Sequence, residues 1–264
     1  MFLSVVLYLS SNSVQPTQTV DGLLKELHFS SFPFSLTIVS ASKHQLSKEL
    51  NLGHEGIIFT VEDTLTVSEG LNEGLKFVNQ SKVHTDYVCL FYDDFQLSEG
   101  YFNTILGVTE EDIDNVLLTP IYTERKHKVP FFSVNGVVFR YQFLQLMLGR
   151  LYEEYVSWQD YPYFYAIARR FKVVKSSGAK FTSLNHRFKM QFEWMEAGIG
   201  YKEKRHTLVF VLRSALQLFS RFQFTACLFL VIGYFRGSNY KYPSKIIRKV
   251  TLSKMRELTT LLTD

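Results

Sequence analysis

Cysteine is scarce in this sequence, and the two that occur make no recognisable site. Cys89 and Cys227 are the only cysteines in 264 residues, and both lie inside apolar segments. A disulfide framework needs several cysteines and a cysteine-based metal site needs them closely spaced, so we expect neither. The small number of cysteines also indicates a reducing compartment.

A glycine-rich phosphate-binding loop is missing after the first apolar segment. The apolar residues 2–10 (FLSVVLYLS) are followed by SNSVQPTQT, which contains no glycine. P-loop and dinucleotide-binding proteins need glycine here because their backbone approaches the phosphates closely. The sequence therefore argues against both classes. It also disfavours a sugar-phosphate nucleotidyltransferase, for which we expect a glycine-rich loop with Lys or Arg at this place.

No apolar segment is long enough to cross a bilayer. Residues 222–235 form an apolar run of 14 residues, whereas a membrane-spanning helix needs about 20. Arg213 and Arg221 interrupt any longer span. The apolar N-terminus has no basic segment before it and no small-residue cleavage site after it. We therefore interpret residues 2–10 as a strand and not as a signal peptide.

The sequence does have a large apolar content and an uneven distribution of charge. Hydrophobic residues make up 46% and aromatic residues 16%, which excludes a disordered chain. Residues 200–264 hold 12 Lys or Arg against 3 Asp or Glu, a net charge of +9, whereas residues 1–199 hold 17 against 22, a net charge of −5. Such a basic segment indicates contact with an anionic surface, and a tail that only aids solubility is the alternative.

Short apolar segments alternate with segments of helical spacing in the first part of the chain. The runs 2–10, 34–41, 55–61 and 87–92 are typical of parallel strands covered on both faces. Leucines at 23, 24 and 27 indicate a first intervening helix, and apolar residues at 71, 75 and 78 indicate another. This alternation predicts an α/β fold with a doubly wound, mostly parallel sheet.

Two adjacent carboxylates, Asp93 and Asp94, end the expected fourth strand, in YVCLFYDDFQL (87–97). Ligands of open parallel sheets bind beyond the carboxyl ends of the strands, so charge at this place is a candidate for ligand binding. Paired carboxylates there can hold Mg²⁺ or Mn²⁺, which in turn neutralises a diphosphate. The alternative is a turn at the end of the strand in which one Asp caps a helix.

The surrounding segment TLTVSEGLNEGLKFVNQSKVHTDYVCLFYDDF resembles the inverting family-two glycosyltransferases of the GT-A fold. The similarity is greatest to the rhamnosyltransferase-like members that build bacterial surface polysaccharides. These proteins carry Asn-x-Gly, here Asn72 and Gly74, on the helix before a strand that ends in Asp-x-Asp. The resemblance implies that Asp94 is a ligand of a divalent cation and that Asp93 lies near the ribose or the metal's water shell. Tyr92 replaces the first member of the motif.

Further segments match the same family in the expected order. FSVNGVVFRYQFL (132–144) resembles the segment that supplies a glycine near the nucleotide, here Gly136, followed by Arg140. By resemblance Asp160 is the general base and Gln159 helps to place the acceptor, although Asp160 also suits a plain helix cap. The resemblance further implies a metal ligand at His186 and a contact with the acceptor or diphosphate at Arg205.

The chain also departs from the family pattern at the nucleotide-binding side. Ser40 replaces the Asp that reads the base at the end of the second strand, and only Asn12 remains of the motif after the first strand. These departures leave the nucleotide open and allow an inactive relative that only binds nucleotide or glycan. The interpretation that we favour is a hexosyl- or deoxyhexosyltransferase that uses a nucleotide-sugar donor and Mg²⁺ or Mn²⁺.

The C-terminal part is expected to be a separate helical extension. We divide the chain into a catalytic domain (1–200) and a basic, amphipathic and apolar helical tail (201–264). Apolar helices flanked by positive charge favour peripheral attachment to an anionic membrane, on its cytoplasmic face, where a lipid-linked saccharide acceptor is presented. The alternative is a helical hairpin packed against the catalytic domain or a second subunit, which leaves a homodimer open. No nucleic-acid partner is expected.

Overall fold

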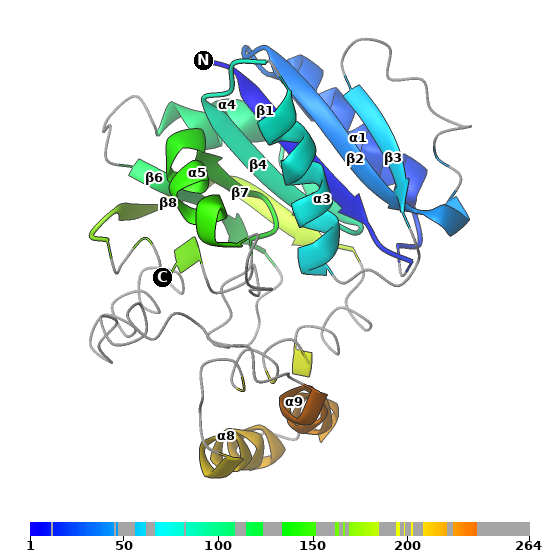
Figure 1. The fold of residues 1–264 in the computed structure, drawn as a ribbon, viewed down its shortest axis with the longest axis vertical. Coiled ribbons are helices and arrows are strands. Elements are labelled where there is room, and N and C mark those ends of the chain that lie inside the picture. Colours follow the sequence, from blue (N-terminus) through cyan, green and yellow to red (C-terminus); the bar gives the residue numbers. More distant parts are fainter. Residues whose placement is uncertain are drawn as a thin grey trace.

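One eight-stranded sheet with helices on both faces forms the main part of the structure (Figure 1). The chain is seen in a computed structural model. It describes residues 1–11, 13–44, 46, 56–61, 67–81, 83–108, 115–123, 134–151, 162, 163, 166, 169–184, 194, 195, 198, 202, 208–220 and 224–236.

The first half of the sheet is parallel throughout, as the apolar runs predicted. Its strands are β1 (Leu3–Leu9), β2 (Phe34–Ala41), β3 (Gly56–Val61) and β4 (Tyr87–Tyr92). Their order in space is β3-β2-β1-β4, and every neighbouring pair is parallel. The chain moves outward from β1 to β3 and then returns to the other side of β1. Between β1 and β4 the winding therefore reverses, and such a switch point is where open α/β sheets bind ligands.

The second half of the sheet mixes strand directions. Its strands are β5 (Phe95–Leu97), β6 (Asn115–Tyr122), β7 (Val137–Arg140) and β8 (Lys172–Ser183). β7 lies antiparallel between β4 and β6, β8 is parallel to β6, and β5 is antiparallel to β8. The complete order is β3-β2-β1-β4-β7-β6-β8-β5. The mostly parallel α/β sheet that the sequence predicted is thus confirmed.

Side chains of β1 alternate between two hydrophobic cores, one on each face of the sheet. Val6 and Tyr8 face a core that includes α3 (Val67–Gln80) and α5 (Tyr141–Leu151). Leu7 and Leu9 face the other core, which includes α1 (Pro16–Phe29) and α4 (Tyr101–Gly107). The helices cover both faces (Figure 1), which is why the strands of the first half read as continuous apolar runs.

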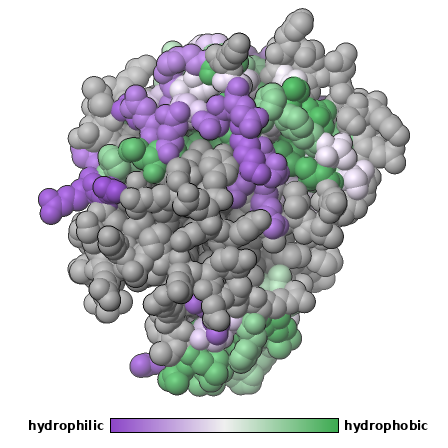
Figure 2. Space-filling model, viewed as in Figure 1, coloured by the Kyte–Doolittle hydropathy of each residue, from purple (hydrophilic) through white to green (hydrophobic). Residues whose placement is uncertain are grey.

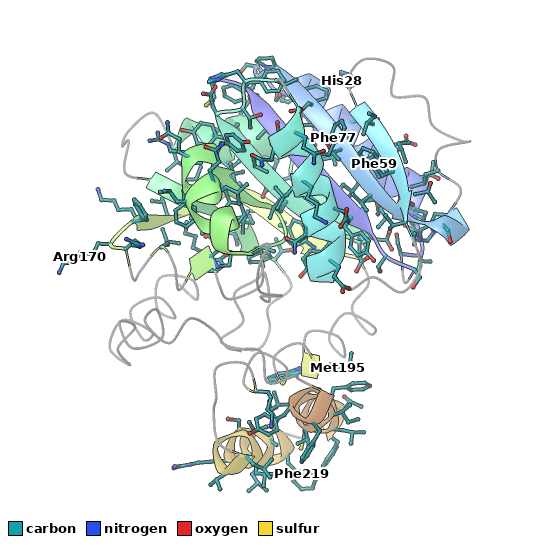
Figure 3. All side chains as sticks on the ribbon, viewed as in Figure 1. His28, Phe59, Phe77, Arg170, Met195 and Phe219 are labelled. Carbon is teal, nitrogen blue, oxygen red and sulfur yellow. The ribbon has the colours of Figure 1, made fainter. Side chains whose placement is uncertain are left out.

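Two glycines let α3 approach the sheet closely. A Cβ atom at Gly70 would lie 2.3 Å from the ring of Tyr8, and one at Gly74 would lie 2.4 Å from Val6. Phe77, further along α3, packs edge-on against Phe59 of β3 with ring centroids 4.8 Å apart (Figure 3). The glycine of the Asn-x-Gly segment therefore has a packing role in this structure.

The C-terminal helices α8 (Leu208–Ser220) and α9 (Phe224–Arg236) pack against each other around a small core of their own. Trp194 belongs to this core. A Cβ atom at Gly198 would lie 2.1 Å from the carbonyl oxygen of Leu230, and one at Gly233 would lie 1.9 Å from that of Met195. Contacts of the helical unit thus cross the expected domain boundary at residue 200.

The same two helices expose an unusual amount of apolar surface. Eight large apolar side chains are between 38% and 75% exposed, and we call them the hairpin surface: Leu208, Val209, Leu212, Leu216, Phe219, Phe224, Leu228 and Phe235. They give the apolar patch at the lower end of the molecule in Figure 2. The ring centroids of Phe219 and Phe224 are 4.8 Å apart, so the exposed side chains of α8 and α9 form one continuous surface. None of the described helices combines the length and apolarity needed to span a membrane.

Candidate functional site

The carboxyl ends of β1 and β4 meet at the switch point of the sheet and bring Ser10 close to Asp93. Tyr8 of β1 pairs with Tyr92 of β4, so the residues after both strands leave the sheet side by side. The amide of Asp93 still donates to the carbonyl oxygen of Tyr8, at 2.8 Å. Asp93 then adopts a left-handed conformation with φ of 54°, which Asp tolerates better than most residues.

Asp94 is a buried residue whose carboxylate caps the start of α1. It is 1% exposed. Its Oδ2 accepts a hydrogen bond from the amide of Val14 at 2.7 Å, and its Oδ1 accepts from the amide of Gln15 at 3.3 Å and from Oγ1 of Thr19 at 3.2 Å. The hydroxyl of Ser13 donates to the same Oδ1.

These contacts hold the residues that lead into a helix without a capping side chain of its own. Gln15 stands at the N-cap position of α1 and makes no capping hydrogen bond. A carboxylate at this place pairs with the unsatisfied amide groups and with the positive end of the helix dipole. The role of metal ligand stays a prediction for Asp94, and in this structure four hydrogen-bond donors surround its carboxylate oxygens.

Asp93 uses only one of its two carboxylate oxygens in the hydrogen bonds of the described residues. Its Oδ1 accepts from the amide of Ser10 at 3.1 Å and from the Ser10 hydroxyl at 2.6 Å. Within the described part of the chain, no hydrogen bond reaches its Oδ2, and the side chain is half-buried. The left-handed turn directs the two neighbouring carboxylates to different partners, which explains how like charges coexist here.

Asn135 and Gly136 hold the end of β4 in place. Oδ1 of Asn135 accepts from the Tyr92 amide at 3.0 Å, and its Nδ2 donates to the Tyr92 carbonyl at 2.9 Å. Gly136 has φ of 79°, and a Cβ atom there would lie 2.8 Å from Phe181. Its amide donates to the carbonyl of Leu90 at 2.8 Å, and the Tyr101 hydroxyl donates to its carbonyl. Both residues fix the backbone just before Asp93.

None of the other residues predicted to bind the nucleotide sugar forms a hydrogen bond with Asp93 in the described part of the chain. Ser40 is 2% exposed, and its hydroxyl donates to the carbonyl of Ala41 at 3.3 Å. Asn72 lies half-buried on α3, between the two glycines that contact β1. Asn12, Gln159, Asp160, His186 and Arg205 lie outside the described residues.

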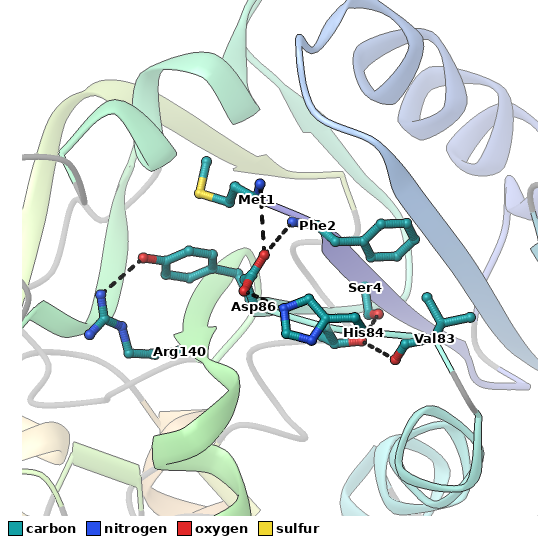
Figure 4. A network of polar contacts seen from close by, with 9 residues as sticks. Met1, Phe2, Ser4, Val83, His84, Asp86 and Arg140 are labelled. Carbon is teal, nitrogen blue, oxygen red and sulfur yellow. Dashed lines mark hydrogen bonds and ion pairs between the residues drawn. The ribbon is translucent and has the colours of Figure 1, made fainter.

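Arg140 lies at the opposite end of the sheet. It pairs in register with Tyr87, the first residue of β4, and one of its guanidinium nitrogens donates to the Tyr87 hydroxyl at 3.4 Å. Figure 4 shows this region, where Asp86 accepts from the Phe2 amide at 2.7 Å and contacts His84 at 3.0 Å. These side chains line a pocket of about 830 Å³ at the amino ends of β1 and β4, away from Asp93.

The described residues were compared with the needs of a divalent cation. They contain no group of three or more His, Cys, Asp and Glu side chains arranged to hold a metal. Mg²⁺ in phosphate-processing sites is commonly held by one or two carboxylates together with substrate phosphates and water. Oδ2 of Asp93 fits that requirement, because it is a carboxylate oxygen without a hydrogen bond in the described part of the chain.

Sequence reasoning predicted a site at Asp93 and Asp94 but not the contacts that these two residues make. Ser10 and Ser13 were not singled out, because two serines in a polar stretch carry no specific signal. Their partners lie 83 and 81 residues further along the chain, so only the pairing of β1 with β4 reveals them.

Comparison with known proteins finds similar folds among solved structures. No protein-family model and no curated protein matches this sequence. Among solved structures, the mannosyltransferase PcManGT from Pyrobaculum calidifontis, in complex with GDP-Man and Mn²⁺, matches with a TM-score of 0.58 and 11% identity over 98% of this chain and 83% of its own. The chain therefore has a GT-A-like fold.

Structures of S. aureus TarS are also similar. TarS 1–349 in complex with UDP-GlcNAc matches with a TM-score of 0.49 and 12% identity, over 75% of this chain and 66% of its own. TarS 1–349 alone matches with a TM-score of 0.48 and 11% identity, over 89% of this chain and 91% of its own.

Proposed function

We propose that this protein is a glycosyltransferase that moves a sugar from a nucleotide-sugar donor to a glycan acceptor with inversion at the anomeric carbon. The observation that carries the proposal is Asp93, which lies at the switch point of a GT-A-like sheet and has one carboxylate oxygen that no hydrogen bond reaches within the described residues. The overlap of 98% of the chain with a mannosyltransferase in complex with GDP-Man and Mn²⁺ supports it.

Asp93 takes the role of metal ligand in this proposal, in place of Asp94. A divalent cation, Mg²⁺ or Mn²⁺, supplies positive charge that stabilises the departing nucleoside diphosphate. The Ser10 amide and hydroxyl hold Oδ1 of Asp93 and thereby direct Oδ2 to the diphosphate. Asp94 acts one step further away, because it fixes the start of α1 next to the same loop.

The remaining contacts with the nucleotide-sugar donor are assigned to residues near the ends of β1 and β2, on α3 and beside Asp93. Asn12 and Ser40 lie after β1 and at the end of β2, on the side where the resemblance puts the base, and Asn72 lies on α3. Gly136 shapes the backbone beside Asp93 and so borders the donor site. The donor sugar is a hexose or a deoxyhexose such as rhamnose.

Asp160 is the proposed base on the acceptor side. It takes the proton of an acceptor hydroxyl while that oxygen forms the new bond to the anomeric carbon and the bond to the diphosphate breaks. Attack on the face opposite the leaving group inverts the anomeric configuration. Gln159 and Arg205 contact the acceptor or the diphosphate, and His186 completes the metal site.

The proposed acceptor is a lipid-linked saccharide of polysaccharide biosynthesis, and the proposed location is the inner face of the cell membrane. The hairpin surface supports this part of the proposal, because apolar side chains exposed on one side of a helix pair suit the interfacial region of a bilayer. The basic character of residues 200–264 suits anionic lipid.

Binding of nucleotide sugars tests the proposal directly. UDP-GlcNAc, GDP-Man and dTDP-rhamnose are added with Mn²⁺ or with EDTA, and the melting temperature is measured. A true donor at a hundredfold excess over its Kd should raise it by about 5 °C, and only with Mn²⁺. Asp160→Asn should keep this shift and lose transfer. A protein that none of these ligands stabilises contradicts the proposal, and a protein that binds a donor but transfers to no acceptor is a binding relative.

A further inference from the structure

His44 makes a specific contact with the loop that carries Ser10. It lies in η1 (Ser42–His44), the short 3₁₀ turn that follows β2. Its Nε2 is 2.7 Å from the carbonyl oxygen of Ser10. A carbonyl oxygen only accepts hydrogen bonds, so Nε2 carries the proton and donates it. The side chain is half-buried.

Ser10 connects this imidazole to the candidate metal ligand. Its carbonyl oxygen accepts from His44 and also from the amide of Ser13, at 3.0 Å. Its amide and its hydroxyl both donate to Oδ1 of Asp93. Every polar group of Ser10 is therefore engaged, with His44 on one side and Asp93 on the other.

The contact also joins three separate elements at the same edge of the sheet. His44 follows β2, Ser10 follows β1, and Asp93 follows β4. The pairing of β1 with β2 ends at Leu9 and Ser40, and that of β1 with β4 ends at Tyr8 and Tyr92. The orientation of Asp93 depends on Ser10, whose own position is held on the far side by the imidazole of His44.

We infer that His44 is a positioning residue for the diphosphate end of the donor site. It holds the Ser10 carbonyl, so that the Ser10 amide and hydroxyl stay directed at Oδ1 of Asp93 and Oδ2 remains directed to the ligand. His44 itself does not contact the diphosphate. This inference rests on the proposed function, because it assigns His44 a role at the same site.

The experiment compares His44→Ala with His44→Gln, whose amide places an N–H donor near the position of Nε2. The dissociation constants of UDP, GDP and dTDP with Mn²⁺ are measured by calorimetry, beside those of uridine, guanosine and thymidine, which lack the diphosphate. His44→Ala should weaken binding of the diphosphate that the wild-type protein prefers by about tenfold, the effect of one lost hydrogen bond. His44→Gln should recover most of that loss, and nucleoside binding should not change.

His28→Ala is the matched control. Its imidazole likewise contacts a backbone carbonyl, that of Leu24 at 2.8 Å, but within the exposed side of α1 (Figure 3). It should leave all affinities unchanged. Ser10→Ala should weaken diphosphate binding as well, and adding His44→Ala to it should cost less than in the wild-type protein, because both changes disturb one chain of contacts.

The outcomes separate this inference from the proposed function. A wild-type protein that binds none of the three nucleoside diphosphates overturns both. A wild-type protein that binds one of them with Mn²⁺, together with a His44→Ala variant of equal affinity, overturns the role of His44 alone. An equal loss of nucleoside and diphosphate affinity in His44→Ala also overturns it, since His44 would then contact the base or ribose.

Discussion

The neighbouring residues Asp93 and Asp94 have opposite surroundings, and substitutions should separate their roles. Asp93→Asn should abolish Mn²⁺-dependent nucleotide binding and change the free energy of unfolding by less than about 1 kcal/mol, because the side chain is half-buried and keeps an oxygen for Ser10. Asp94→Ala should lower that free energy by about 2–4 kcal/mol, because the buried donors at the start of α1 lose their acceptor.

Chemical denaturation and calorimetry on the same two variants check this prediction. Urea titrations give the free energy of unfolding, and Mn²⁺-dependent binding of UDP and GDP gives the ligand role. The assignment is reversed if Asp94→Ala folds with wild-type stability and loses the metal dependence of binding, while Asp93→Asn keeps it.

The sequence carried enough information to find both carboxylates, but their roles depend on distant residues. Helix capping by an Asp was one of the two interpretations of this pair, and Asp94 does cap a helix. That helix is α1, whose first residues lie about eighty positions earlier in the chain. Local sequence patterns predict a capping side chain only when it lies within a few residues of its helix. They contain no information on a capping side chain that the pairing of two distant strands brings to the helix.

At the scale of single elements, β1 to β4 were predictable from their continuous apolar runs, and the helices α1 and α3 from the helical spacing of their apolar residues. β5 was not, since its three residues become a strand only by pairing with β8. The tail at 201–264 was expected to be helical, and α8 and α9 are two helices among its described residues.

The hairpin surface gives a prediction at the element scale. Leu216 and Leu228 are 67% and 57% exposed, so glutamate at both positions should leave the fold intact. The substituted side chains should however no longer bury apolar area in a bilayer. Co-sedimentation with vesicles of anionic lipid should therefore fall at least about tenfold. Phe29→Glu is the control, because Phe29 is 58% exposed on α1 and lies outside the hairpin surface.

The same variants distinguish a bilayer from a second copy of the chain. If the surface joins two subunits, the paired glutamates should convert a dimer into a monomer in sedimentation velocity, and the wild-type protein should not need lipid. If lipid binding is unchanged while Phe29→Glu reduces it, the hairpin surface is not the membrane contact.

At the scale of the whole molecule, Asp86 links stability to pH. Burial raises the pKa of this carboxyl, but the hydrogen bond from the Phe2 amide and the hydrogen bond and charge of His84 outweigh burial and hold the pKa below its usual range. A depressed pKa means that the folded state is stabilised above the pKa of the unfolded chain, about 3.9, and loses that stabilisation as pH falls through the folded-state pKa.

Asp86→Asn should therefore lower the melting temperature at pH 7, and the difference from the wild-type protein should shrink as pH falls below about 4. Melting curves between pH 7 and pH 3 measure this difference. Asp21→Asn removes the same charge from the exposed side of α1 and serves as the control. A difference that stays constant over the whole range contradicts the role of Asp86.

The long-range cap of α1 also has a consequence for the order of folding. A short helix is marginal in water, and α1 has no N-terminal capping side chain of its own to favour it. Its first turn gains an acceptor only after β4 has joined β1 and delivered Asp94. On the ribosome, α1 is completed late although it is synthesised early, and a nascent chain that ends before residue 94 leaves this helix open at its first turn.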